Sequence, residues 1–295
     1  MAIKNLFHRI KRERSAYFFI LPTLILSLTL LFYPLTQGVW LSFFKANLRA
    51  QNWVGFKNYW DLMNSPMFWL TLKNTFILVA ILVPLLICFS LILASLILKF
   101  NRYLQTFFRA AFYLPTISSG IVMAMVWLWI FEPTYGLLNY LLSLFGVPPV
   151  IWLGTVNPAR FSVAFVVFTW LLGSTLILYL AALSAIPKTI YEAAEMDGAG
   201  ILQKFFKVTI PLVMPMTLYL LVTSTIGAFQ IWEAVYLLTA GGPAYGTTTL
   251  AYRIYYLGFR YYRFGQASSY AVILLIIVFS IAFFQFRHLR KEVEF

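Results

Sequence analysis

Three of the chain's nine acidic residues fall within six positions, at Glu192, Glu195 and Asp197. Ala193 and Ala194 lie between them, and such small side chains let a partner approach closely. The carboxylates would then offer charge-assisted hydrogen bonds to Arg or Lys across an interface. A helix cap and charge balance with nearby lysines would explain the same acids without a partner. The pattern therefore indicates either a docking surface or a solvated helix.

The polar stretch that holds these acids, residues 184–211, is predicted to form a helix, a turn and a second short helix. Thr189 and Glu192 have the spacing of a capping box, so the first helix should begin near Ile190. Gly198 and Gly200 can adopt the positive φ that ends a helix. The acids would thus lie on a compact helical loop between two long apolar segments.

A second set of candidate residues lies in or beside apolar segments. Glu233 is the one acid near the interior of such a segment, and intramembrane carboxylates usually face a cavity or a partner. Aromatic faces mixed with hydroxyl and amide groups suit a sugar, although Ser and Thr are also routine in helix–helix packing. No Lys, Arg or His lies deep in a segment, which favours a neutral sugar over a phosphorylated one. The candidate substrate-path residues are Trp170, Ser174, Thr175, Ser224, Gln230, Trp232 and Glu233.

The composition shows what kind of scaffold must position these residues. The 295 residues are 62% hydrophobic and 11% charged, whereas a soluble domain is about 45–50% apolar and about 25% charged. A single cysteine, Cys88, excludes a disulfide framework, and the two histidines form no ligand cluster, so no metal site is expected. The chain is therefore predicted to be an integral membrane protein.

Membrane-spanning helices need about 20 apolar residues each. Seven segments without Asp, Glu, Lys or Arg are long enough, but residues 133–159 contain seven Pro and Gly residues. Helix-breaking residues at that density indicate an external loop. An all-α protein with six transmembrane helices is predicted, at Ser15–Phe44, Asn74–Leu98, Ala110–Phe131, Phe161–Pro187, Val208–Trp232 and Phe264–Phe286.

The distribution of basic residues predicts the orientation. With the N-terminus inside, 14 of the 22 Lys and Arg residues lie on the cytoplasmic side, so both termini are expected there. The net charge of +13 then reflects helix ends beside anionic lipid, and no nucleic-acid partner is expected. Residues 1–71 would form the N-terminal tail, an uncleaved first helix and an external loop. Residues 72–286 would form the five-helix core with loop 184–211, and 287–295 a C-terminal tail.

The acidic loop and a series of further motifs resemble the permease subunits of type I ABC importers, in the carbohydrate-uptake branch that includes the maltose and glycerol-phosphate permeases. Glu192-Ala193-Ala194-x-x-Asp197-Gly198, followed by Ile210-Pro211, resembles the EAA loop of these proteins. The resemblance covers nearly the whole chain and implies the type I ABC importer permease fold. The other matching motifs are Trp53-Val-Gly-Phe-Lys-Asn-Tyr59, Leu72-Lys-Asn-Thr75, Tyr113-Leu-Pro115, Tyr135-Gly-Leu-Leu-Asn139, Leu238-Thr-Ala-Gly-Gly-Pro243 and Thr247-Thr-Thr249.

The resemblance implies that the EAA-like loop is a coupling helix that docks on a separate ABC ATPase, of which two copies would be present. Glu192, Ala193, Ala194, Asp197 and Gly198 would make this contact. The chain has no G-x-x-x-x-G-K-[ST] phosphate loop. It is therefore expected to be non-catalytic and to bind no cofactor itself, while ATP and Mg are used by the partner ATPase.

The resemblance also implies partners within and outside the membrane. A second related permease would pair with this chain, with a heterodimer favoured over a homodimer. An extracytoplasmic solute-binding protein would deliver the sugar and contact Gly241, Gly242 and Pro243. A simple turn would explain the same glycines and proline. The protein would be a multi-pass component of a bacterial or archaeal cell membrane.

Two other classes of membrane protein fit the sequence less well. An ion-coupled secondary sugar transporter would normally show several intramembrane ionisable residues and paired broken helices. Glu233 alone is little support for that class. A membrane-embedded enzyme would need acids, histidines or metal ligands clustered at one membrane face, and the only acidic cluster here lacks histidine.

Overall fold

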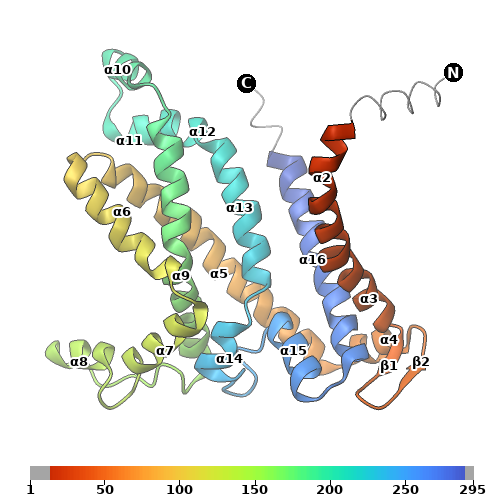
Figure 1. Cartoon of the computed structure of the whole chain (residues 1–295). Helices are drawn as coiled ribbons and strands as arrows, with labels where there is room; N and C mark the ends of the chain where they lie inside the picture. Colours follow the sequence, from red (N-terminus) through yellow and green to blue (C-terminus); the bar gives the residue numbers. More distant parts are fainter. Residues whose placement is uncertain (1–13, 290–295) are drawn as a thin grey trace.

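A computed structural model describes residues 14–289, which form a helical bundle apart from one two-stranded hairpin (Figure 1). The start of α2 and the end of α16 lie at the same end of the molecule as α10 and α11, here called the α10 end. The opposite end, here called the α15 end, holds α7, α8, α14, α15 and the hairpin. Part of the orientation prediction rests on tail residues outside the described range, namely Lys4, Arg9, Lys11, Arg12, Arg290 and Lys291.

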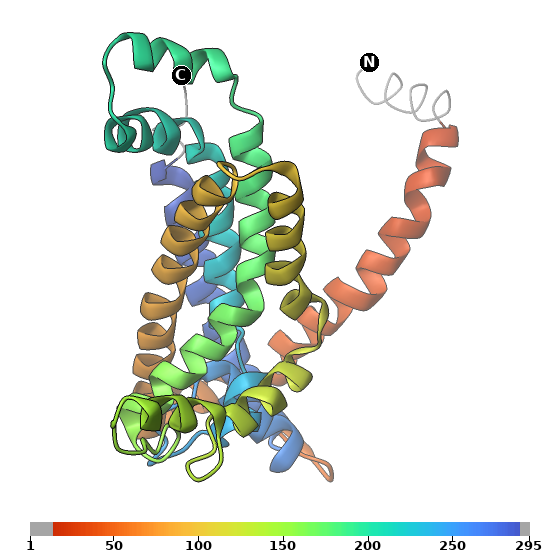
Figure 2. The same ribbon diagram turned by 90° about the vertical axis from the view of Figure 1, so that its left-hand side faces the viewer.

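The first apolar segment is a nearly continuous helix, and none of its residues from Phe18 to Leu41 is buried against the rest of the chain. Only its last part packs on α16, and Figure 2 shows the helix leaning away from the bundle toward its beginning. It consists of α2 (Arg14–Ser27), the π-helical turn η1 (Leu28–Phe32) and α3 (Tyr33–Leu41).

The antiparallel hairpin that follows the first segment departs from the all-α expectation. Its strands β1 (Phe44–Ala46) and β2 (Gln51–Trp53) are followed by the short helix α4 (Lys57–Met63). Asn58 fixes the hairpin to α4 because its Nδ2 donates to Ser42 O at 2.7 Å and to Phe44 O at 2.9 Å.

Two long helices, α5 (Pro66–Ile97) and α9 (Val156–Ser184), make the centre of the bundle. Their apolar side chains form most of one buried core, in which Leu82 and Leu176 are completely enclosed. Helix α5 begins eight residues before the predicted Asn74, because Lys73 lies on its surface and does not interrupt it. The sequence prediction placed the start of this helix too late, because it took a charged residue at the edge of the apolar run as the boundary.

The predicted helix at Ala110–Phe131 is two helices in the structure, α6 (Arg102–Ile117) and α7 (Gly120–Ile130), which meet at 102°. The Ser119 side chain caps α7 by accepting from Val122 N at 3.3 Å. Because Ser and Thr side chains satisfy the first orphan N–H groups of a helix, the chain can stop and restart here within an apolar region.

The fifth predicted segment is also broken, with a bend of 68° between Ile201–Leu212 and α13 (Met214–Phe229). The first part combines α11 (Ile201–Lys204), η2 (Phe205–Thr209) and α12 (Ile210–Leu212). Four helical segments among the described residues are long and apolar enough to cross a membrane, and the two bent pairs raise the number to as many as six.

The remaining helices are short, except for the last. The Pro- and Gly-rich segment 133–159 does not form a long helix and holds only α8 (Leu137–Leu144) and the start of α9. The other elements are α10 (Lys188–Met196), α14 (Glu233–Thr239), α15 (Leu250–Tyr255), η3 (Tyr256–Arg260) and α16 (Phe264–Leu289).

Candidate functional site

Helix α10 carries the acidic motif and ends as the sequence predicts. Ala199 N donates to Ala194 O and Gly198 N donates to Glu195 O, both at 2.9 Å. This pair of bonds, with Gly198 at φ 78°, is a Schellman motif, which requires the left-handed conformation that glycine adopts without strain. The motif fixes where the acidic helix stops.

The predicted start of this helix is wrong. Helix α10 begins at Lys188, two residues before Ile190, and Pro187 occupies the N-cap position without a side-chain cap bond. Thr189 therefore lies inside the helix, and the capping box with Glu192 does not form. A proline disfavours the helical conformation in the residue before it, so Pro187 limits how far the helix can extend toward its N-terminus.

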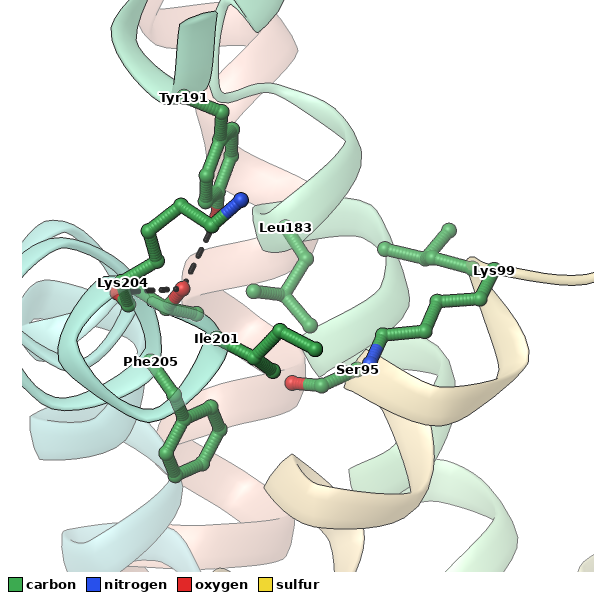
Figure 3. Close-up of a pocket in the computed structure, with 9 residues that line it drawn as sticks. Ser95, Lys99, Leu183, Tyr191, Ile201, Lys204 and Phe205 are labelled. Atoms are coloured by element: carbon green, nitrogen blue, oxygen red, sulfur yellow. Dashed lines mark hydrogen bonds between the residues drawn. The ribbon is translucent and has the colours of Figure 1, made fainter. Parts of the chain in front are cut away.

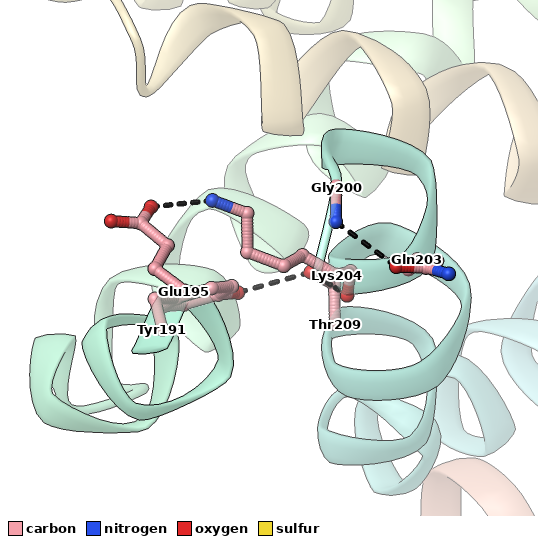
Figure 4. A network of polar contacts seen from close by, with 6 residues as sticks. All are labelled: Tyr191, Glu195, Gly200, Gln203, Lys204 and Thr209. Carbon is pink, nitrogen blue, oxygen red and sulfur yellow. Dashed lines mark hydrogen bonds and ion pairs between the residues drawn. The ribbon is translucent and has the colours of Figure 1, made fainter. Parts of the chain in front are cut away.

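A cavity of 530 Å³ lies between this loop and the adjacent ends of α5 and α9 (Figure 3). The loop itself is held together by polar contacts between α10 and the segment that follows (Figure 4). Glu195 forms an ion pair with Lys204, and the hydroxyls of Tyr191 and Thr209 are 3.1 Å apart. Gly200 N donates to Gln203 Oε1 at 3.0 Å. The two short helices are thus joined as one body.

The outer surface of this loop is apolar as well as acidic. Glu192, Ala193, Asp197 and Gly198 are exposed, and Ala194 is half-buried. Beside them, Met196 (89% exposed) and Leu202 (72%) are accessible apolar side chains, and Ile201 (70%) lines the cavity on the inner side of the loop. Large exposed apolar surfaces usually mark an interaction site. A docking surface explains this arrangement better than a solvated helix does.

The second candidate site forms at the break between α6 and α7. A Cβ on Gly120 would lie 2.6 Å from Glu233 Oε2 and 3.0 Å from the Trp170 ring. These three residues come from α7, α14 and α9, so the structure brings Trp170 and Glu233 together as candidates. The carboxylate stands at the first turn of α7, where the positive end of a helix dipole stabilises negative charge.

Hydrogen bonds to Trp170 hold this break in place. Its Nε1 donates to Ser118 O at 3.0 Å, and its own carbonyl accepts from Thr116 Oγ1 at 2.9 Å. One turn farther along α9, a Cβ on Gly173 would lie 2.3 Å from Phe112 O. The close contact of α6 with α9 therefore depends on a glycine and on backbone groups that the end of α6 leaves free.

The other substrate-path candidates do not converge on this cluster. Ser174 and Thr175 both donate to Leu171 O, at 2.8 and 3.2 Å, so their hydroxyls serve their own helix. Trp232 stacks on Tyr255 with ring centroids 4.4 Å apart. Of the remaining two, Ser224 is half-buried in α13 and Gln230 is exposed.

A buried polar network at the α15 end was not anticipated from the sequence. Arg160 Nη2 donates to Asn74 Oδ1 at 2.6 Å, and Arg160 Nε donates to Gly246 O at 2.7 Å. Asn74 Nδ2 in turn donates to Tyr245 O at 2.8 Å and Thr248 O at 3.1 Å. Asn74 belongs to the motif at 72–75 that resembles the family, but nothing in the sequence indicated a network there or identified Arg160 as its partner.

This network holds the loop that contains the predicted binding-protein contact. Gly241 is buried and has φ 84°, and a Cβ there would lie 2.5 Å from Thr248 Oγ1. Gly242 and Pro243 are half-buried. The exposed tip is formed instead by Ala244 and Tyr245. Gly241 thus has the role of a structural turn.

Tyr252 secures the other side of the same loop. Its hydroxyl donates to Ala240 O at 3.1 Å. Burial raises the pKa of the Tyr252 phenol above its usual value, so the hydroxyl remains a donor to a higher pH than a solvent-exposed tyrosine would. Among residues 14–289, no group of three His, Cys, Asp or Glu side chains could hold a metal ion.

Long apolar helices, two bent helix pairs and a polar helical loop at one end are the features of a polytopic membrane protein. The comparisons assign the family. The chain belongs to the binding-protein-dependent transport system inner membrane components, whose family model matches residues 86–291. It is therefore a multi-pass protein of the cell membrane, as the sequence predicts.

Individual relatives agree with this family. The chain is 33% identical to the probable ABC transporter permease protein YurN of Bacillus subtilis, over 94% of this chain and 97% of that protein. It is 32% identical to the trehalose/maltose transport system permease protein MalF of Thermococcus litoralis, over 96% of each. The resemblance to carbohydrate ABC importer permeases is confirmed.

A solved structure shows the same fold. One chain of a bacterial alginate ABC transporter, in complex with a periplasmic protein that carries an alginate pentasaccharide, superposes with a TM-score of 0.85. The two chains share 25% sequence identity, and 98% of each is covered.

Proposed function

We propose that this chain is the membrane-spanning permease subunit of an ATP-driven importer that takes a sugar or oligosaccharide from an extracytoplasmic binding protein. The observation that carries the proposal is the exposed acidic and apolar surface of α10 in a chain of this family. Both sequence relatives are transporter permeases, and the alginate transporter forms a complex with a periplasmic protein.

Helix α10 docks on a separate ABC ATPase in this proposal. Exposed Glu192, Ala193, Asp197 and Gly198, with half-buried Ala194, form the contact together with the apolar side chains around them. The ion pair between Glu195 and Lys204 transmits a push on α10 to α11, η2 and the bend before α13. Two ATPase copies use ATP and Mg, and this chain performs no hydrolysis and binds no cofactor.

The orientation follows from the same docking. The α10 end lies in the cytoplasm, together with the start of α2 and the end of α16, which Figure 1 places at that end. The positive-inside distribution of Lys and Arg supports this choice. The α15 end then faces the binding protein, with the exposed residues Ala244 and Tyr245 at the tip of the loop that contains Gly241, Gly242 and Pro243.

A second, related permease completes the translocation path. The first helix buries none of its residues from Phe18 to Leu41 within this chain, so it is available both to lipid and to a neighbouring subunit. A heterodimer is favoured over a homodimer by the resemblance.

The sugar passes beside Glu233 and Trp170 at the α6–α7 break in this proposal. An aromatic face and a carboxylate together suit the stacking and hydroxyl hydrogen bonds of a sugar. Of the two, Glu233 is the charged residue, and it would repel an anionic cargo. A neutral sugar therefore fits this place better than an acidic one such as alginate.

Uptake by the complete importer in vesicles tests the proposed function. With ATP inside and all ion gradients collapsed, uptake of sugar from its loaded binding protein should continue. Loss of uptake under these conditions would favour the ion-coupled secondary transporter instead. The same assay without internal ATP should show no accumulation.

A further inference from the structure

The cavity lies between loop 184–211, here called the coupling loop, and the adjacent ends of α5 and α9. Several elements contribute to its lining. Residues of α5, α9 and α10 face those of α11 and η2 across it (Figure 3). Any molecule in the cavity therefore touches both the coupling loop and the bundle. Its lining consists of Ser95, Leu98, Lys99, Leu183, Tyr191, Ile201, Lys204, Phe205 and Thr209.

The charge of this lining is positive. Lys99 and Lys204 contribute two ammonium groups, and no Asp or Glu is among the described lining residues. Lys204 is paired with Glu195, but Lys99 has no acidic partner within 4 Å in the described part of the chain. Figure 3 shows the Lys99 side chain running back toward Ser95 at the edge of the cavity. Lys99 is exposed, so its ammonium group is accessible to an anionic group that enters from outside.

The rest of the lining is largely apolar and lies beside the ends of two apolar helices. Leu98, Leu183, Ile201 and Phe205 form walls that a soluble anion would not need. Helices α5 and α9 are both apolar enough to span a membrane, and the cavity lies at their ends, where such helices leave the hydrocarbon. Basic pockets between membrane helices on the cytoplasmic side suit anionic lipid head groups.

We propose that this cavity binds one anionic phospholipid of the cytoplasmic leaflet, with its phosphate at Lys99 and an acyl chain along Leu98, Leu183 and Phe205. The inference rests on the proposed orientation, which places the α10 end in the cytoplasm. The lipid braces the coupling loop against the ends of α5 and α9. Its presence makes the response of the ATPase to the loaded binding protein depend on the anionic lipid content of the membrane.

Photolabelling of the complete importer in nanodiscs tests the site directly. The probe is phosphatidylglycerol with a diazirine in one acyl chain, compared with phosphatidylcholine that carries the same diazirine. Peptides that contain Leu98, Leu183 or Phe205 should be labelled preferentially by phosphatidylglycerol. Lys99→Gln should reduce this labelling about fivefold, since one lysine near an anionic surface contributes about 1 kcal/mol.

Two further variants distinguish lipid binding in the cavity from a general attraction of anionic lipid to surface charge. Arg102→Gln removes an exposed cation three positions away that does not line the cavity, and labelling should stay at the wild-type level. Ser95→Trp fills part of the cavity without changing charge, and labelling should fall. Equal labelling by both lipids, or an equal loss in Arg102→Gln and Lys99→Gln, would overturn the proposal. So would displacement of the probe by inorganic phosphate, which would identify a soluble anion as the ligand.

The labelling experiment requires neither ATP nor the binding protein. The outcome of an uptake measurement in the same preparation is therefore independent of the outcome of the labelling. Labelling without ATP-driven uptake would reject the proposed importer function and leave the site on the α10 end intact, whereas uptake without labelling would reject the lipid site alone.

Discussion

Arg160 and Asn74 are joined by a hydrogen bond of 2.6 Å that connects the start of α9 to α5, across 86 positions of sequence. Each residue also binds the loop before α15. Arg160 reaches Gly246 O, and Asn74 reaches Tyr245 O and Thr248 O. Two helix surfaces and one loop are therefore positioned by a single pair, at the end of the molecule where the binding protein is proposed to dock.

Replacing Asn74 should destabilise the protein. Asn74→Ala removes three hydrogen bonds and leaves Nη2 of the half-buried Arg160 guanidinium without its side-chain acceptor, and a hydrogen bond to a charged group is worth about 1.5–3 kcal/mol. We expect a lower melting temperature in detergent and weaker stimulation of the ATPase by the loaded binding protein. Asn64→Ala, which removes an exposed amide bonded to Trp60 O within its own helical turn, is the matched control. Equal melting temperatures for the two variants would contradict the proposed role of the pair.

Replacing Gly198 should uncouple ATP hydrolysis from uptake. Its φ of 78° costs a side-chain-bearing residue about 1–2 kcal/mol, although a Cβ would meet no atom within 4 Å. Gly198→Val should therefore alter the end of α10 through the backbone alone, with normal insertion into the membrane. We expect fewer sugar molecules imported per ATP hydrolysed, measured in proteoliposomes.

Gly200 provides the control for this effect. A Cβ at this position would likewise meet open space, but the φ of Gly200 is −69°, which any L-residue adopts. Gly200→Ala should keep the wild-type ratio of sugar to ATP. A wild-type ratio in Gly198→Val as well would show that the Schellman motif is not needed for coupling.

The exposed apolar part of α10 gives a separate prediction. Met196 is 89% exposed, so Met196→Ser removes little packing within this chain and should leave its melting temperature unchanged. If the side chain is buried against the ATPase, co-purification of the ATPase should fall about tenfold, which corresponds to about 1.4 kcal/mol of lost binding. Tyr103→Ser, at a residue 88% exposed near the α10 end, should leave co-purification unchanged. Equal co-purification of the two variants would place the docking surface elsewhere.

How much of this structure could be predicted depended on whether a feature was local. Apolar segment length and the density of Pro and Gly indicated the long helices and excluded 133–159 as a span. Gly198 marked the end of α10 because a positive φ is a property of one position. The start of α10 was wrong because Thr189 and Glu192 have the right spacing for a cap, while Pro187 begins the helix without one.

Features made by distant contacts were not predictable in this way. The break at Ser118 and Ser119 lies inside an apolar run, and Trp170, 52 positions away from Ser118, accounts for it by binding the freed carbonyl. The Asn74–Arg160 pair is likewise a tertiary contact. Glu233 was expected at the end of a long span, but it begins the separate helix α14, and only the fold brings it to Gly120 and Trp170.

The fit of Glu233 against Gly120 gives the sharpest test of the proposed substrate path. Gly120→Ala would place a Cβ 2.6 Å from Glu233 Oε2, which is too close, and 3.0 Å from the Trp170 ring, which is tight. The carboxylate must move, so we expect a raised KM for sugar uptake. Gly227→Ala, where a Cβ meets nothing within 4 Å, should leave KM unchanged. Glu233→Asp shortens the side chain. When it is combined with Gly120→Ala, the raised KM should return part of the way to the wild-type value. A double-mutant cycle measures this coupling, and additive effects of the two changes would mean that Glu233 does not contact Gly120 during transport.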